Sequence, residues 1–143
     1  MNIREAQLAD AEALHAINQT SLGYDYPLEL TKKQLESLLK ESDNKLFVSL
    51  IEGQVCGYIH AAVYQTTYAP KLLNILALAV ATTVHGKGCG KALMTEVEHW
   101  ALTIDATGIR LNSGEDRTSA HQFYEHIGFT KRKNQANYYK MLN

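Results

Sequence analysis

The chain has 143 residues, a formal net charge of −1, and hydrophobic and charged fractions of 45% and 20%. These values are typical of one soluble globular domain and exclude the charge-rich, weakly hydrophobic composition of disordered chains. The small net charge argues against nucleic acid as the main partner, because phosphate backbones are bound through a concentrated positive field.

The sequence shows neither a membrane segment nor a metal-binding pattern. The start, Met1–Glu5, lacks the apolar core of a secretory leader, and no run approaches the roughly 18 apolar residues of a membrane helix. We therefore expect a cytoplasmic protein without a membrane partner. Cys56, Cys89 and the six histidines lack metal-ligand spacing, so we expect free thiols and no bound metal.

The N-terminal part is predicted to form a strand followed by two helices. Asn2–Ala6 is expected to be a short strand, after which Asp10 can cap a helix whose Leu14 and Ile17 recur at helical spacing. An aromatic, acidic loop follows. The segment Thr31–Gln34 then has the pattern of a capping box, which predicts the start of a second helix.

The middle of the chain is predicted to contain three strands and a glycine loop. Lys45–Glu52 and Val55–Tyr64 are β-branched and aromatic runs joined at Gly53–Gln54, which indicates an antiparallel hairpin. Leu72–Val80 is nearly continuous apolar sequence, which is typical of a strand covered on both faces and central in its sheet. This strand leads into the glycine-rich loop His85–Gly90.

The C-terminal part is predicted to contain two further helices, each followed by a strand. The helix after the glycine loop has one apolar face and is expected to end near Thr107–Gly108. A strand over Ile109–Ser113 should follow, and then a helix that starts at Ser119 and is closed by Gly128. The last strand is expected over Tyr138–Leu142.

The order of the predicted elements, β-α-α-β-β-β-α-β-α-β, defines the fold class. It predicts a single α/β (α+β) domain over residues 1–143, in which helices flank a mixed central sheet. No linker, repeat or low-complexity stretch divides the chain.

The loop His85–Gly90 has the features of a phosphate-binding turn. Its glycines allow backbone conformations closed to other residues, and their N–H groups can converge on an anion at the positive end of the following helix. Lys87 and Lys91 add positive charge. A Walker A loop would require Ser or Thr where the chain has Ala92, and the third glycine of a Rossmann loop would fall on Lys91. Neither nucleotide motif fits.

Two distant segments together resemble the GNAT family of N-acetyltransferases. His85–Gly90 is similar to the family motif Gln/Arg-x-x-Gly-x-Gly/Ala and departs from it only at the first position. Ala120–Phe129 is similar to the family segment Ala-x-x-x-Tyr-Glu-x-x-Gly-Phe, on the helix after the fifth strand. The resemblance spans essentially the whole chain, and it implies the GNAT fold and an acetyl-CoA-dependent N-acetyltransferase, a kind of acyltransferase.

The resemblance also implies where acetyl-CoA binds. In this family the loop amides hold the pyrophosphate of coenzyme A, and a bulged fourth strand offers N–H groups to the thioester carbonyl, a role that falls around Leu78–Val80. His85 replaces the usual Gln or Arg beside the phosphates, and Arg117 stands where relatives often have an Asn beside the pantetheine arm. The expected cofactor contacts are Leu78, Ala79, Val80, His85, Gly86, Lys87, Gly88, Cys89, Gly90, Lys91, Asn112 and Arg117.

Acetyl transfer from a thioester to an amine needs a neutral amine, an oxyanion stabiliser and a proton for the departing thiolate. Tyr124 stands at the position of the family tyrosine, and the resemblance implies that it is the general acid. A phenol stays protonated at neutral pH and can supply this proton. Many relatives have a Glu in the fourth strand, where this chain has only Asn74 among apolar residues. The base is therefore a water relayed by backbone carbonyls, or one of His60, Asp25 and Glu115.

The acceptor side in this fold usually includes the loop between the first two helices, which here contains Tyr24, Asp25 and Tyr26. A carboxylate among aromatic rings can hold a cation, so a small cationic amine is the preferred acceptor. A protein N-terminus or a lysine is an alternative, because the fold does not select among acceptors. A non-catalytic CoA-binding sensor or interaction module is an alternative function, and the family also allows a homodimer.

Overall fold

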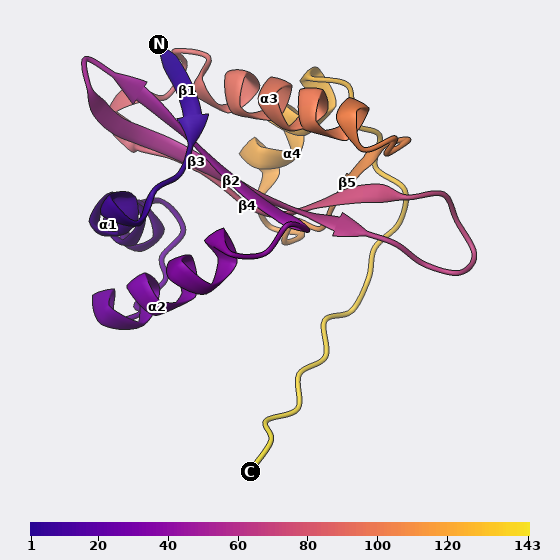
Figure 1. The fold of residues 1–143 in the computed structure, drawn as a ribbon. Helices are drawn as coiled ribbons and strands as arrows, with labels where there is room; N and C mark the ends of the chain where they lie inside the picture. The colour runs from indigo at the N-terminus through magenta and orange to yellow at the C-terminus, as the bar shows by residue number, and fades with distance from the viewer. The chain divides into compact units, whose positions relative to one another are not determined.

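The computed structural model describes residues 1–143, which divide into two compact units, residues 1–111 and residues 112–143. The first unit contains a five-stranded sheet with helices on both of its faces (Figure 1). The second unit contains one helix and the C-terminal segment. None of the helices has the length and the apolar content that a membrane span requires.

The strands of the sheet lie in the order β1-β2-β3-β4-β5. Their bounds are Asn2–Glu5 for β1, Asn44–Ile51 for β2, Gln54–Tyr64 for β3, Leu72–Val80 for β4 and Ile109–Leu111 for β5. The pairs β1–β2, β2–β3 and β3–β4 are antiparallel, whereas β4 and β5 are parallel. This mixed sheet confirms the predicted fold class, and the predicted hairpin between β2 and β3 is present.

Helices cover both faces of this sheet because each presents one apolar side to it. α1 (Ala11–Ser21) and α2 (Leu28–Leu39) lie on one face, and α3 (Cys89–Thr103) lies on the other (Figure 1). Short 3-10 turns over Leu8–Asp10 and Thr82–Val84 precede α1 and α3. The buried apolar side chains of the three helices are Ala11, Leu14, Ile17, Leu35, Leu93, Met94, Val97, Trp100 and Ala101.

β4 has two features that shape the centre of the first unit. Its register with β3 shifts once, so that Leu76 is an extra residue, a β-bulge, between Ile75 and Ala77. β5 pairs with β4 only over Leu73–Ile75, so the rest of that edge of β4 has no partner strand. Leu76 is 54% exposed. The prediction that β4 is covered on both faces therefore fails at the bulge.

Two helix starts differ from the predicted caps. Asp10 precedes α1, but its carboxylate accepts hydrogen bonds from the Arg4 guanidinium at 2.7 and 3.0 Å and from the Gln7 N–H at 2.8 Å. These bonds leave it no role as a side-chain cap of α1. α2 begins directly after Pro27, and Thr31 lies inside the helix with its hydroxyl donating to the Pro27 carbonyl at 3.1 Å. Proline suits a helix start, which explains the earlier beginning.

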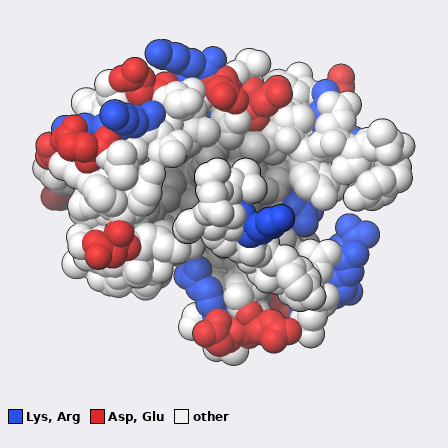
Figure 2. Space-filling model, turned by 90° about the horizontal axis from the view of Figure 1, so that it is seen from below, with Lys and Arg blue, Asp and Glu red and all other residues white.

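The surface carries charges of both signs. Basic and acidic side chains lie interspersed on the face drawn in Figure 2, in keeping with the net charge of −1. Lys45 pairs with Glu5 at 2.9 Å, and Lys32 lies 3.5 Å from Glu29 within α2. Exposed pairs of this kind contribute little to stability.

In the second unit, α4 (Thr118–His126) holds a small aromatic cluster. The rings of Phe123 and Phe129 lie edge-on to the ring of Tyr124, with centroid distances of 5.4 and 5.7 Å. The Phe129 N–H also donates to the Tyr124 carbonyl at 2.9 Å. These contacts end α4 and pack Phe129 against Tyr124 in its last turns.

The predicted last strand is wrong, because Tyr138–Leu142 forms neither a strand nor a helix. Tyr138 is 93% exposed, and no backbone hydrogen bond joins residues 130–143 to another segment. Aromatic and apolar residues favour a strand only where a neighbouring strand pairs with their N–H and C=O groups. The segment has the sequence propensity of a strand, but no neighbouring strand pairs with it.

Candidate active site

The loop before α3 has the geometry of an anion-binding turn. Gly86 and Gly88 have φ angles of 83° and 82°, which side chains rarely adopt, and nothing lies within 4 Å of the position of an added Cβ. Gly88 is the N-cap of α3, and no side chain caps this helix. The N–H groups of the first turn, from Cys89 to Lys91, are therefore available at the positive end of α3. This arrangement suits a pyrophosphate.

His85, Lys87 and Lys91 are the exposed charged or titratable side chains of this loop. The Nε2 atom of His85 lies 3.1 Å from the carbonyl oxygen of Val80. Because a carbonyl only accepts, Nε2 carries the proton in this contact, and the ring is folded back on the end of β4. Lys87 and Lys91 form no ion pair, so their positive charges are open to an anionic ligand.

Cys89 belongs to the loop, but its side chain points into the core. It is 2% exposed, and its Sγ lies 3.8 Å from the Sγ of Cys56, which lies 3.4 Å from the Ser49 hydroxyl. Both cysteines are free thiols. Burial raises the pKa of Cys89, which keeps the thiol protonated. Only the backbone of Cys89 can therefore serve the expected cofactor contact.

The unpaired edge of β4 presents backbone groups of Leu78 and Val80. The Ala81 N–H donates to the Cys56 carbonyl of β3 at 2.7 Å, and successive strand residues alternate between their two neighbours. Leu78 and Val80 therefore face away from β3, along the edge where β5 no longer pairs. The Val80 carbonyl accepts a hydrogen bond there from the Ser21 hydroxyl at 3.0 Å.

The third expected contact in β4 has a different environment. Ala79 is 4% exposed, and it pairs with Tyr58 of β3. The bulge itself is at Leu76, two residues before Leu78–Val80. Nothing in the sequence marks that position, because all residues around it are apolar.

Tyr24, Asp25 and Tyr26 are exposed in the loop between α1 and α2. Beneath them, the Tyr58 hydroxyl of β3 donates to Asn18 Oδ1 of α1. Burial raises the pKa of Tyr58 to about 12, with a smaller contribution in the same direction from Tyr24 and an opposing one from Asn18. The Tyr24 N–H donates to the Asn18 carbonyl at 3.0 Å, so the loop starts beside the residue that bonds to Tyr58.

Among the candidate bases, His60 lies on β3 and is 9% exposed. Its Nε2 is 2.8 Å from Asn44 Oδ1, an acceptor, so Nε2 carries the proton and Nδ1 holds a lone pair. Burial lowers the pKa of His60, which keeps the ring neutral at pH 7. Asp25 and Glu115 are exposed.

The predicted residues of the second unit cluster around α4. Tyr124 is half-buried between its aromatic neighbours, and burial raises its pKa against a smaller opposing effect of Arg117. The phenol is therefore protonated at neutral pH, as a general acid requires. Arg117 is the exposed N-cap residue of α4, and Asn112 is also exposed.

Three polar side chains on one line across the sheet, interrupted by an alanine, were missed by the sequence analysis. Asn44, Ala62, Asn74 and Arg110 are direct neighbours in β2, β3, β4 and β5. Arg110 donates to Asn74 at 2.7 Å, and its guanidinium lies 4.3 Å from the centre of the Tyr64 ring. The signals in the sequence were one Asn and one Arg within apolar strands, and the register that joins them is set by pairing across the sheet.

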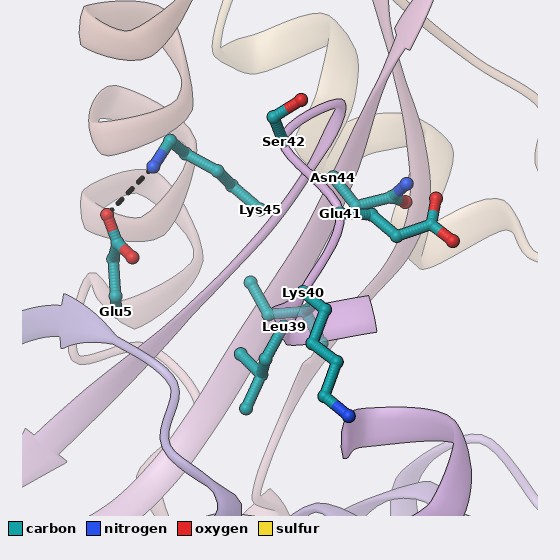
Figure 3. Close-up of a pocket in the computed structure, with 8 residues that line it drawn as sticks. Glu5, Leu39, Lys40, Glu41, Ser42, Asn44 and Lys45 are labelled. Carbon is teal, nitrogen blue, oxygen red and sulfur yellow. Dashed lines mark hydrogen bonds and ion pairs between the residues drawn. The ribbon is translucent and has the colours of Figure 1, made fainter. Parts of the chain in front are cut away.

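A pocket lies elsewhere, between the end of α2 and the start of β2 (Figure 3). The ion pair of Lys45 and Glu5 forms part of its wall. None of the expected cofactor, acceptor or catalytic residues lines it. The lining residues are Glu5, Leu39, Lys40, Glu41, Ser42, Asn44, Lys45 and Leu46.

Known proteins share both the sequence pattern and the fold. The model of the acetyltransferase (GNAT) family matches residues 11–129, and the chain belongs to this family. The structure of AAC(6')-Iy in complex with the bisubstrate analogue CoA-S-monomethyl-acetylneamine is similar, with a TM-score of 0.87 at 15% identity, over 99% of this chain and 98% of that one. The family and fold implied by the two motifs are thus confirmed, and the expected enzyme class and cofactor are those of the family.

Two relatives by sequence are named for different N-acetylation reactions. N-acetylaspartate synthetase of Homo sapiens is 26% identical over 91 residues, which are 64% of this chain and 29% of that protein. N-alpha-acetyltransferase of Sulfurisphaera tokodaii is 26% identical over 145 residues, 96% of this chain and 84% of that protein. The chain thus spans less than a third of the length of the human relative.

Proposed function

We propose that this protein transfers the acetyl group of acetyl-CoA directly to a primary amine while both substrates are bound. The observation that carries the proposal is the loop before α3, whose glycines of positive φ and uncapped helix start suit the pyrophosphate of coenzyme A. The unpaired edge of β4 supports it. N–H groups of Leu78 and Val80 there can receive the pantetheine arm or polarise the thioester carbonyl.

In this proposal Tyr124 is the general acid that protonates the departing thiolate. We expect Tyr124→Phe to lower kcat about 100-fold and to leave the Kd for acetyl-CoA within about two-fold of wild type, because only the proton donor is lost. Thiol release gives kcat, and calorimetry gives the Kd. Tyr138→Phe removes a phenol that is 93% exposed and is the matched control. Unchanged turnover in Tyr124→Phe would exclude this role.

The acceptor amine is proposed to bind beside the loop of Tyr24, Asp25 and Tyr26. Their exposure leaves a carboxylate and two rings accessible to an ammonium group. The names N-acetylaspartate synthetase and N-alpha-acetyltransferase suggest an amino acid or an N-terminus as acceptor, and structural neighbours include an aminoglycoside N-acetyltransferase. All of these acceptors are primary amines.

The acceptor must lose a proton before it attacks the thioester. His60 suits a base because it is neutral and its Nδ1 holds a lone pair, whereas a water relayed by backbone carbonyls needs no titrating side chain. The pH dependence of kcat/KM separates them. Protonation of the amine lowers the rate toward low pH with either base, whereas only His60 would steepen this fall below its own lowered pKa.

A non-catalytic CoA-binding module is the second candidate, favoured by the absence of a carboxylate in β4 and by the turn of His85 back onto Val80. Calorimetry with acetyl-CoA, followed by thiol release with a panel of amines, separates the two functions. Binding with turnover supports the transferase, and binding without turnover across the panel supports the module. No binding of acetyl-CoA would contradict both.

A further inference from the structure

Residues 138–142, here called the apolar segment, form an exposed apolar stretch. The side chains of Tyr138, Tyr139, Met141 and Leu142 are between 71% and 93% exposed. Single apolar side chains are common on protein surfaces, but four large ones within five residues make a continuous patch, which is typical of an interaction site. The patch indicates that the apolar segment binds to another surface.

The apolar segment has the pattern of a strand that is covered on both faces. In an extended chain alternate side chains point to opposite faces, so Tyr139 and Met141 share one face, and Tyr138 and Leu142 share the other. Both faces are thus apolar, as in strands that are enclosed within a protein. Within one copy of the chain, however, residues 130–143 form no helix or strand and make no backbone hydrogen bond to another segment (Figure 1).

β5 is an edge strand whose outer side can pair with a further strand. It is the last strand in the order of the sheet. The Leu73 N–H donates to the Gly108 carbonyl at 3.0 Å, which fixes the side of β5 that faces β4. Because successive strand residues turn their N–H and C=O groups to opposite sides, those of Ile109 and Leu111 point away from β4, and no other segment bonds to them. Such a row of backbone groups is a template for pairing with another chain.

The opposite edge of the sheet is less suited to receive the apolar segment. β1 carries charged side chains held in ion pairs, Arg4 with Asp10 at 2.7 Å and Glu5 with Lys45 at 2.9 Å. Charged side chains on an edge strand oppose pairing with another chain. The outward-facing residues of β5, Ile109 and Leu111, are instead both apolar. The edge of β5 therefore matches the apolar segment better.

The residues before the apolar segment allow it to reach a second copy. Residues 130–137 span at most about 28 Å when extended, and mutual repulsion of Lys131, Arg132 and Lys133 favours an extended chain. The exposed acidic residues Glu115 and Asp116 follow soon after β5 in the sequence. A segment that pairs antiparallel to β5 begins beside the end of β5, which brings these basic and acidic residues of two copies to the same side. Opposite charges thus favour the antiparallel direction.

We propose that this protein forms a two-fold dimer in which the apolar segment of each copy pairs, antiparallel, with the outer side of β5 in the other copy. Each copy carries one strand without a partner and one edge without a neighbour, so a single exchange satisfies both copies. Burial of two tyrosines, a methionine and a leucine removes roughly 400 Å² of surface from water in each copy. Two segments and the two surfaces that receive them amount to roughly 1,600 Å², the size of a standard stable interface. This inference goes beyond the proposed acetyl transfer and does not depend on it.

Two measurements on the full chain test the dimer. Sedimentation velocity over a series of concentrations gives its Kd, and amide hydrogen exchange locates the pairing. Unpaired amides at an open edge or in an exposed segment exchange quickly. As the protein concentration rises above the Kd, we expect exchange at Ile109, at Leu111 and in the apolar segment to slow about 100-fold or more. The dependence on concentration separates pairing between copies from pairing within one copy.

Matched substitutions test which apolar residues form the interface. Met141→Lys and Tyr139→Lys place a charge in it, at residues that are 71% and 82% exposed in a single copy. Leu102→Lys on α3 and Tyr68→Lys between β3 and β4 make the same changes at residues that are 74% and 81% exposed. Each change occurs twice in a two-fold dimer, so the first two should raise the Kd about 100-fold or more, and the controls should leave it within about three-fold. Met141→Leu keeps the apolar face and should keep the dimer.

Four results would overturn the inference. The chain could sediment as a single copy at every concentration, or it could dimerise while the apolar segment still exchanges quickly, which would place the interface elsewhere. Slow exchange that does not depend on concentration would show that the apolar segment pairs within its own copy. Controls that weaken the dimer as much as Met141→Lys would show that other apolar residues form the interface. None of these results bears on acetyl transfer, which thiol release measures separately.

Discussion

Burial favours the uncharged form of four titratable side chains, those of Tyr58, His60, Cys89 and Tyr124. Loss of hydration disfavours the charged form, so the pKa values of the phenols and the thiol are raised and the pKa of the imidazole is lowered. All four groups are therefore uncharged at neutral pH. The proposed reaction joins a neutral amine to a neutral thioester, and uncharged proton donors and acceptors suit it.

Tyr58 allows this effect to be measured through stability. Its pKa of about 12 in the folded protein lies above the ordinary value of 10.0, so its contribution is fully present below pH 10 and is lost as the pH rises toward 12. We expect the free energy of unfolding of wild type to fall about 2 kcal/mol more than that of Tyr58→Phe between about pH 9 and pH 12. Urea unfolding at each pH provides the values. Parallel curves would show that Tyr58 ionises as easily in the folded as in the unfolded chain.

The residues of the candidate site differ in how visible they are in the sequence. The role of Gly86 and Gly88 in the loop was predicted because their backbone angles favour glycine. A glycine at such a position is visible in the sequence. Arg110 and Asn74 carry no comparable mark. Their contact joins positions 36 residues apart, and it exists only because two parallel strands pair in one register.

At the scale of elements, the loop before α3 joins a glycine turn directly to the start of a helix. The sequence predicted β4 with its observed bounds, because a long apolar run between turn signals has few alternatives. It did not predict the true start of α2 or the partner of Asp10, since several polar residues near a helix start compete for the same role. The prediction of a strand over Tyr138–Leu142 failed because strand propensity does not provide a partner strand.

Gly88 and Gly53 form a matched pair for testing the loop. Both have positive φ angles, 82° and 77°, and neither has an atom within 4 Å of an added Cβ, but Gly53 lies in the β2–β3 turn. We expect either change to Ala to cost about 1–2 kcal/mol of stability, because a side chain disfavours this backbone region. Only Gly88→Ala should also weaken CoA binding, about ten-fold, because the N–H groups of the loop shift. Equal CoA affinity in the two variants would contradict the role of the loop.

At the scale of the molecule, cofactor binding should stabilise the fold through the phosphate-binding loop. CoA at one hundred times its Kd is expected to raise the free energy of unfolding by about 2.7 kcal/mol. Pantetheine lacks the pyrophosphate and at the same concentration should add less than about 1 kcal/mol. Denaturant unfolding with each ligand measures both values. Equal stabilisation would mean that the loop contributes nothing to affinity.

The mixed sheet and the helices that cover it were predictable because the order of the elements and the two motifs agreed with each other. Agreement between local patterns and a global fold is what a foldable sequence requires. The acceptor side was less predictable, because no motif in the sequence marks the residues that would bind the amine. The names of the two sequence relatives likewise do not agree on one acceptor.

The contact between Cys89 and Cys56 has a kinetic consequence. Cys89 is the first residue of α3, so the same short segment offers its N–H groups outward and seals its thiol inward. A reagent can alkylate this thiol only during a local opening that lifts the start of α3 from the sheet. The rate of alkylation therefore measures how often this opening occurs. A ligand that binds to the loop would slow alkylation without contacting the sulfur.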